Sequence, residues 1–301
     1  MLTIVMYHYV RDGARLSART TAELERELDH VAERYTCVTI EDVARKGWPD
    51  GACLLTFDDG FVEHLATVAP ALEQRGLTGV FCPPGRAVVE RRPLDVNKTQ
   101  FLLAAGDDHG ALGDRILDRV DDPARVWAEN TPAHRFDPPE KVFVKRALQE
   151  GLPEPLRTEL LDELFHELVT RDERAFADEL YLTLDQCREL VARGHEVIGH
   201  GWEHRRLGLL GEDAQRAELV HTREFVAEVG GTWAVSYPYG SRDETTLRLL
   251  EESDCTVGLT IEPRRATRED PLLELPRIDT NDLQREVVEV ARAGSPLAEP
   301  A

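Results

Sequence analysis

Residues 54–60, Leu-Leu-Thr-Phe-Asp-Asp-Gly, constrain the fold of this chain more than any other segment. An apolar run between Gly51 and Gly60 predicts a short strand that is buried on both faces, as in parallel sheets. Asp58 and Asp59 then fall at the carboxyl end of this strand, which is where α/β folds bind their ligands. Two adjacent carboxylates there are unfavourable unless a cation or a bound proton relieves their repulsion. The simpler alternative is that one of them caps the following helix.

Strand-like and helix-like segments alternate on both sides of the middle of the chain. β-Rich runs are followed by segments whose apolar residues recur at helical spacing. This alternation predicts parallel strands in a closed or doubly wound sheet. Besides the strand before Asp58, the expected strands are 2–7, 36–40, 78–82, 195–199, 232–236, 256–261 and 272–278, and the expected helices are 20–34, 62–75, 183–193, 213–229, 243–253 and 281–293.

The middle of the chain has a different character. Strand-like runs almost vanish over residues 86–180, and charged helical segments take over at 94–105, 112–120, 141–149 and 155–169. We therefore predict a core formed by residues 1–85 and 181–295, a helical insertion over 86–180 and a tail over 296–301. The insertion is expected either to shape the substrate site or a subunit contact, or to be a solvated elaboration of the core.

The charge of the chain restricts its partners. A formal net charge of -21 argues against nucleic acid and against anionic membrane surfaces. No apolar run reaches the length of a membrane span. Residues 1–10 lack the basic region, apolar core and cleavage site of a secretory signal, so we expect a cytoplasmic location.

The cysteines are widely spaced and odd in number. They lie mostly in apolar surroundings and form no Cys-x-x-Cys pair, which favours buried reduced thiols over a disulfide framework or a thiolate metal site. They are Cys37, Cys53, Cys82, Cys187 and Cys255.

Polar residues follow two further strands. His200 and His204 come after one of them, and residues 237–240, Tyr-Pro-Tyr-Gly, come after the other. A His-x-x-x-His pair presents two imidazoles on one side of a helical turn, at the spacing that a divalent metal needs. Two ordinary surface histidines are the alternative for an isolated pair. Two histidines with one aspartate leave coordination positions open, which is typical of a catalytic metal site.

The chain resembles the polysaccharide deacetylases of carbohydrate esterase family 4. The resemblance rests on Thr-Phe-Asp-Asp-Gly at 56–60, His-Gly-Trp-Glu-His at 200–204 and Tyr-Pro-Tyr-Gly at 237–240, in that order. It covers the core on both sides of the insertion. It implies an α/β fold, a distorted (β/α) barrel, and an enzyme that hydrolyses the linear amide of an N-acetylated sugar with a metal-activated water.

The resemblance also implies roles for individual residues. Asp59, His200 and His204 would bind a divalent metal, which zinc suits best, with cobalt, nickel or iron as alternatives. Asp58 would be the general base. The backbone N–H of Tyr239 would help to hold the oxyanion.

The chain departs from the family pattern at the general acid. The usual donor is a histidine on a late strand, but the last histidine here is His221, on the helix before the third motif. Some relatives place the acid on the first strand in a Tyr-His context, so we assign it to His8, after Tyr7; an ordinary loop histidine is the alternative. His64 is expected to face solvent, inside the helix that follows Asp59.

Two further residues bear on the same site. Ser236 stands where the family commonly has an arginine at the head of the third motif. Arg277, at the end of the last strand, could supply the missing charge. His195 begins a strand, so we expect it at the end away from the metal pair.

These departures leave two other functions open. One is a related amidohydrolase that acts on a non-sugar amide or ureide with the same metal site. The other is a carbohydrate-binding pseudoenzyme, against which the intact set of Asp58, Asp59, His200 and His204 argues.

Overall fold

The computed structural model describes residues 1–13, 16, 18–106, 108–133 and 137–294 of this 301-residue chain. The chain forms two compact units. The barrel unit consists of Met1–Gly13, Ala18–Arg91 and the described chain from Asp178 onward, and the helical unit consists mainly of Arg92–Ala177. The predicted tail, 296–301, lies outside the described residues.

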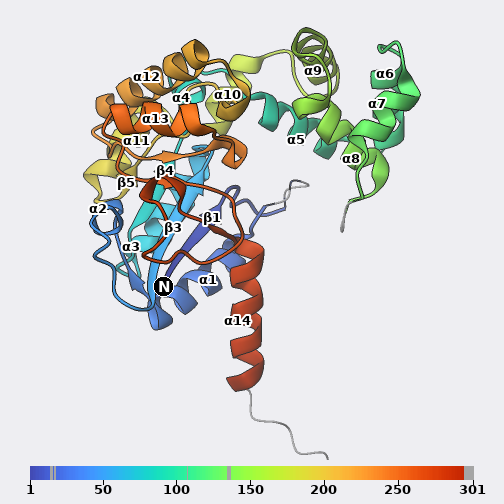
Figure 1. Ribbon diagram of the computed structural model, residues 1–301. Helices are drawn as coiled ribbons and strands as arrows, with labels where there is room; N and C mark the ends of the chain where they lie inside the picture. Colours follow the sequence, from blue (N-terminus) through green and yellow to red (C-terminus); the bar gives the residue numbers. More distant parts are fainter. Residues whose placement is uncertain (14–15, 17, 107, 134–136, 295–301) are drawn as a thin grey trace, which may run out of the picture. The chain divides into compact units, whose positions relative to one another are not determined.

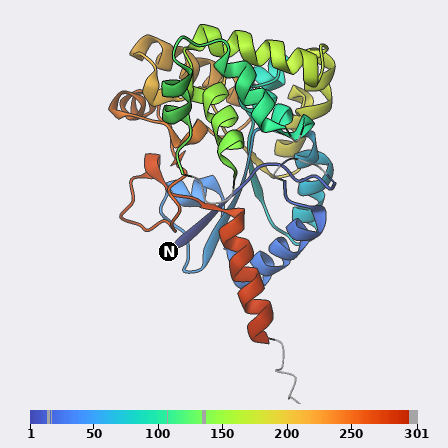
Figure 2. The same ribbon diagram turned by 90° about the vertical axis from the view of Figure 1, so that its right-hand side faces the viewer.

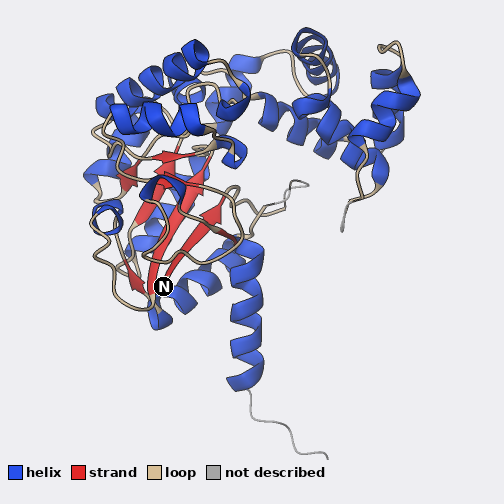
Figure 3. Ribbon diagram, in the orientation of Figure 1, coloured by secondary structure: helices blue, strands red, loops and turns tan. Residues whose placement is uncertain are grey.

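The barrel unit is built on a parallel sheet (Figures 1 and 3). The longest strands, β1 and β3, pair in register from Leu2 beside Ala52 to Tyr7 beside Phe57. The sheet order is β5-β4-β3-β1-β8, and β2 pairs with the start of β3. The strands are β1 (Leu2–Tyr7), β2 (Thr36–Cys37), β3 (Ala52–Asp58), β4 (Gly79–Cys82), β5 (Glu196–Val197) and β8 (Ile278–Asp279).

Two short strands complete the ring. β6 (Val235–Ser236) and β7 (Gly258–Leu259) pair in parallel. A parallel bridge joins Gly199, just after β5, to Val235, and a second joins Leu259 to Leu275, shortly before β8. These links close an irregular barrel, and the predicted α/β fold with a distorted (β/α) barrel is confirmed.

Alternation along the strands separates two cores. Successive side chains of a strand point to opposite faces. Val5 and Tyr7 of β1 therefore pack outward in one cluster, whereas Leu2 and Ile4 pack inward with Leu54 of β3 in another. Every residue of β3 is buried. Asp58 has the same parity as Leu54, which sends its carboxylate toward the barrel interior.

Helices cover the outer face of the barrel, and α14 lies beside α1 (Figure 2). Several begin at side chains that accept a backbone N–H, such as Thr20, Thr183 and Asp243. No helix in the described part of the chain is long and apolar enough to cross a membrane. The helices are α1 (Thr21–Arg34), α2 (Ile40–Ala44), α3 (Ala69–Glu73), α4 (Gly85–Val89), α11 (Leu184–Ala192), α12 (Glu212–Glu228), α13 (Glu244–Glu252) and α14 (Thr280–Gly294).

Most of the predicted strands are shorter than expected, and for two of them the structure shows why. The strand at 36–40 ends at Cys37, because Thr39 caps helix α2. The strand at 272–278 begins instead with a 3-10 turn, Leu272–Glu274. Pro276 lacks a backbone N–H, so regular pairing resumes only at Ile278.

The helical unit has a core of its own. Leu102, Phe143 and Phe165 are fully buried in one apolar cluster within it. Lys98 is also buried, and its Nζ lies 2.7 Å from both Asp162 Oδ1 and Glu173 Oε1. The helices that begin in this segment are α5 (Asp95–Ala105), α6 (His109–Leu117), α7 (Pro123–Asn130), α8 (Pro139–Arg146), α9 (Glu154–Leu168) and α10 (Glu173–Leu180).

The thiols are unpaired, as the sequence predicts. All of the cysteines are free, and Cys53, Cys82 and Cys187 are buried. Burial raises the pKa of Cys187 to about 12, so its reactive thiolate form is disfavoured.

A carboxylate is buried beneath the first strand. Glu27 of α1 is 1% exposed, and Arg19 Nε lies 3.4 Å from its Oε1. Burial raises the pKa of Glu27 from 4.5 to about 7, even though Arg19 opposes that rise. The folded chain therefore binds a proton that the unfolded chain has already lost in this pH range.

We expect the stability of the protein to fall as the pH rises from 4.5 to about 7, because the folded state must then ionise Glu27. Glu27→Gln should be more stable than the wild type at pH 8, by up to about 3 kcal/mol, and this gain should vanish near pH 4. Urea unfolding across the pH range measures the difference. Glu33→Gln, at an exposed site on the same helix, is the control. A gain that is independent of pH would contradict the assignment.

Candidate metal centre

The first motif forms a tight left-handed turn at the end of β3. Asp59 has φ +73° and Gly60 has φ +67°. A Cβ atom at Gly60 would lie 2.5 Å from the Cβ of Pro83, so only glycine fits there. The N–H of Asp59 donates to the carbonyl of Cys82 on the neighbouring strand. The turn thus fixes Asp59 at the carboxyl edge of the sheet.

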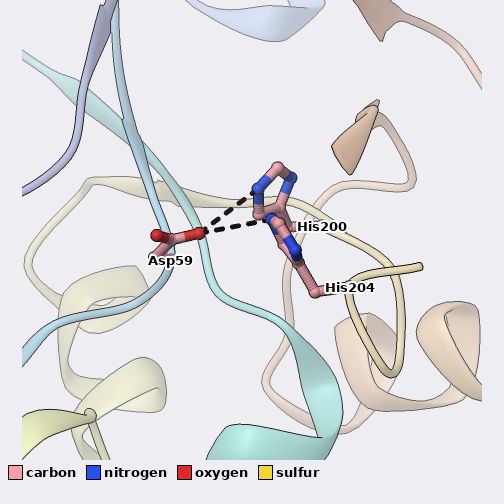
Figure 4. A group of neighbouring side chains, drawn as sticks. All are labelled: Asp59, His200 and His204. Carbon is pink, nitrogen blue, oxygen red and sulfur yellow. Dashed lines mark ion pairs between the residues drawn. The ribbon is translucent and has the colours of Figure 1, made fainter. Parts of the chain in front are cut away.

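Asp59, His200 and His204 converge at this edge (Figure 4). Asp59 Oδ1 lies 3.5 Å from His200 Nε2 and 3.5 Å from His204 Nε2. Ligand atoms at about 2.1 Å from a tetrahedral cation are about 3.4 Å apart, so these separations fit one ion. Asp59 Oδ1 is buried and has no hydrogen-bond partner among the described residues. The three side chains therefore suit a divalent cation.

The protonation of the histidines suits the same purpose. His200 Nδ1 lies 2.8 Å from the carbonyl oxygen of Ser236, to which it donates, and this leaves Nε2 facing Asp59. Burial and the neighbouring His200 lower the pKa of His204 from 6.5 to about 3, so its ring is neutral. Burial opposes a charge on His200, but Asp58 and Asp59 outweigh it and raise its pKa. The two carboxylates thus favour positive charge at His200, while His204 is a neutral ring with a free lone pair for a metal.

The two histidines do not lie on a helical turn, and that expectation is wrong. Residues 200–206 have no helical assignment. Gly201 and His204 adopt left-handed conformations, with φ +71° and +57°. The loop thereby folds back, and the two imidazole centroids come within 4.7 Å of each other.

Asp58 lies next to this cluster and is held as a carboxylate. Arg277 Nη1 lies 3.0 Å from its Oδ1, and Arg277 Nη2 lies 2.9 Å from its Oδ2. The hydroxyl of Ser236 donates to Oδ2 at 3.2 Å. Burial alone would raise the pKa of Asp58, but the Arg277 guanidinium and His200 hold it well below its usual range. Asp58 is therefore ionised throughout the physiological range.

Arg277 makes the contact that the sequence analysis suggested for it. The guanidinium is fully buried, and its Nε donates to the carbonyl of Thr260 at 2.8 Å. Nη1 also lies 3.1 Å from Thr56 Oγ1. Ser236 in turn contacts both Asp58 and His200, a role that no sequence signal indicates. The serine and the late arginine together surround Asp58.

His8 leaves the sheet on the same edge. It follows Tyr7, which pairs with Phe57, so its register position is next to Asp58. Electrostatic interaction with His8 is among the smaller causes that lower the pKa of Asp58 and Asp59. His8 is partly exposed, so a ligand can approach it. Its placement meets the first requirement for a proton donor at this site.

His64 does not face solvent, and that expectation is wrong. Its side chain is fully buried, and its Nε2 donates to the carbonyl oxygen of His8 at 2.9 Å. The predicted helix at 62–75 opens with a π-helical turn, His64–Val68, before α3. The ring packs at its edge against Phe57 and Phe61. Burial lowers the pKa of His64, so it is a neutral donor.

Tyr239, from the third motif, lies beside His204. It sits in the 3-10 turn Pro238–Gly240 with φ +57° and ψ +15°. The centroids of the Tyr239 and His204 rings are 4.9 Å apart, with the rings edge to face. The Cζ atom of Arg206 lies 3.9 Å from the centroid of the Tyr239 ring. His195, in contrast, precedes β5 at the opposite end of the strands and contacts the N–H of Gly79. All three motifs thus meet at one edge.

Comparisons with known proteins agree with this arrangement. A polysaccharide deacetylase family model matches residues 170–258. YxkH of Bacillus subtilis (strain 168), named as a polysaccharide deacetylase, is 28% identical over 100 residues, which are 33% of this chain and 36% of that protein.

Solved structures share the fold of the whole chain. Streptococcus pyogenes deacetylase PplD, in complex with acetate, aligns with a TM-score of 0.59 and 17% identity over 96% of both chains. IcaB from Ammonifex degensii aligns with a TM-score of 0.57 and 17% identity over 97% of both chains. The resemblance to the polysaccharide deacetylases is therefore confirmed.

Replacing His204 by alanine should weaken metal binding by more than about a hundredfold, because one of three converging ligands is lost. Elemental analysis after equilibration with Zn²⁺ measures the bound metal, and circular dichroism checks the fold. His109→Ala, on helix α6 of the helical unit, should keep the metal. Unchanged metal content in His204→Ala would show that the site is wrong.

Proposed function

We propose that this chain, which has the motifs and the fold of the polysaccharide deacetylases, is a metal-dependent hydrolase that removes the N-acetyl group of an N-acetylated sugar or glycan. One observation carries the proposal. An ionised carboxylate, Asp58, is fixed beside a buried cluster of Asp59, His200 and His204 that suits a divalent cation. A general base next to such a cluster is the arrangement that amide hydrolysis needs.

The cation would be held by Asp59 Oδ1 and by the Nε2 atoms of His200 and His204. Two imidazoles and one carboxylate suit zinc, and cobalt, nickel and iron accept the same donors. When bound, the cation polarises the amide carbonyl and lowers the pKa of the attacking water.

Asp58 takes a proton from the attacking water. Arg277 lowers the pKa of Asp58 in spite of its burial, so the carboxylate is ionised and available as a base. Arg277 also fixes both oxygens of Asp58, so the base cannot rotate away.

Tyr239 and His8 serve the other side of the reaction. The ring of Tyr239 contacts that of His204, and we assign the backbone N–H of Tyr239 to the developing oxyanion. The leaving amine needs a proton, and an imidazole titrates in the useful range. His8 is the histidine that we assign to this step, since its register position is next to Asp58.

The purified chain with Zn²⁺ or Co²⁺ should release acetate from oligomers of N-acetylglucosamine. Asp58→Asn should bind the metal but lose about a hundredfold or more of kcat, because the base is removed. N-Acetylated amino acids and ureides form the comparison panel. Turnover of those compounds without turnover of the sugars would favour the amidohydrolase. Metal binding without any turnover would favour the pseudoenzyme.

His8→Ala should keep its metal and its KM but lose most of its kcat, because only protonation of the leaving amine is impaired. Steady-state kinetics and metal analysis on the same preparation separate these effects. His109→Ala is the matched control, since that ring lies on helix α6 of the helical unit. Near-normal turnover of His8→Ala would remove His8 from the mechanism.

A further inference from the structure

Helix α12 carries a charged residue on its buried face. Leu219, Thr222, Phe225 and Val226 pack inward from this helix, and Glu218 lies on the same face with 5% of its surface exposed. A carboxylate in such a position is unfavourable unless hydrogen bonds replace its lost water. Glu218 therefore needs partners, and their identity indicates its role.

The partners of Glu218 are in the loop between the two metal histidines. Its Oε2 accepts from the backbone N–H of Trp202 at 2.9 Å and from that of Glu203 at 3.1 Å. One carboxylate oxygen thus holds two consecutive peptide groups. Hydrogen bonds to an ionised acceptor are about twice as strong as neutral ones.

The same loop is held from its other side by helix α4. The N–H of Gly85 donates to the carbonyl of Gly201 at 3.1 Å, and the N–H of Arg86 donates to that of Trp202 at 2.9 Å. Gly85 also packs against the Trp202 ring, which a Cβ atom would approach to 2.4 Å. The carbonyls of the loop are thus bound to α4 and two of its N–H groups to α12.

This fixation matters because the loop has no regular structure of its own. Residues 200–206 are not helical, and His204 has φ +57°, a conformation that non-glycine residues seldom adopt. Glycine readily adopts the left-handed conformation at Gly201, but the sequence offers no such freedom at His204. External hydrogen bonds must therefore impose it.

We propose that Glu218 is a positioning residue of the metal centre, which fixes the 201–203 loop so that His200 and His204 converge on Asp59. The inference rests on the metal site of the proposed function. Loss of the carboxylate frees the N–H groups of Trp202 and Glu203, and the loop relaxes from its left-handed path. The binding site for the cation is then no longer preformed.

The test is Zn²⁺ titration of the full chain by calorimetry after removal of metal with a chelator. Glu218→Ala should bind Zn²⁺ about 10- to 100-fold more weakly than the wild type. Glu218→Gln keeps an acceptor oxygen for the two N–H groups, so it should stay within about threefold of the wild type. Glu224→Ala, at an exposed site on the same helix, is the matched control and should bind normally.

Hydrogen exchange of the metal-free wild type supplies a readout that does not depend on folding of the alanine variant. The amides of Trp202 and Glu203 should be protected in the wild type and should exchange faster in Glu218→Gln, whose neutral oxygen accepts more weakly. Equal Zn²⁺ affinity of Glu218→Ala and wild type, or unprotected amides in the wild type, would overturn the role of Glu218 alone. A wild type that binds no Zn²⁺ would overturn both this role and the proposed metal site.

Discussion

The ion pair between Arg277 and Asp58 is the interaction on which the rest of this site depends. Both groups are almost completely buried, and each would be strongly destabilising there without the other. The pair joins the end of β3 to the segment before β8, two strands that β1 separates in the sheet. The guanidinium also offsets the charge of one of the two adjacent aspartates. Among the described residues, Asp59 has no such guanidinium counter-charge, and its buried Oδ1 is free to bind a cation.

The chain that carries Arg277 is irregular. The 3-10 turn Leu272–Glu274 and Pro276 interrupt it, and β8 begins only at Ile278. The carbonyl of Thr260 and the hydroxyl of Thr56 hold the Arg277 guanidinium. The orientation of the base thus depends on a residue that lies outside the regular strands.

The sequence predicts those features that depend on which end of a parallel strand a residue occupies. Asp58 ends a strand and His200 follows one, and parallel strands bring their carboxyl ends to one edge, so their meeting is foreseeable. Arg277 lies just before β8, and its contact with Asp58 is not foreseeable in this way. The free cysteines are foreseeable from their apolar neighbours in the same way.

The sequence does not predict features that depend on unusual backbone conformations, such as a π-helical turn or a residue with positive φ. His64 is buried because a π-helical turn opens its helix, and apolar spacing gives no sign of that turn. The left-handed loop that carries His204 and the two contacts of Ser236 have no local signal either, because distant segments impose them. Ser236 stands where the family commonly has an arginine. In this chain the guanidinium beside Asp58 comes instead from Arg277, just before β8.

Asp59, His204 and Tyr239 have in common that each is a non-glycine residue with positive φ, at +73°, +57° and +57°. Each of the three motifs therefore holds one residue in a conformation that glycine adopts more readily, at a cost of about 1–3 kcal/mol apiece. Selection for stability and selection for the site act in opposite directions at these positions. A descendant of this chain that no longer needed the site would gain stability by changing these same three residues. In such a descendant, substitutions should appear first at Asp59, His204 and Tyr239. Arg277 and Asp58, which stabilise each other, should be retained longest.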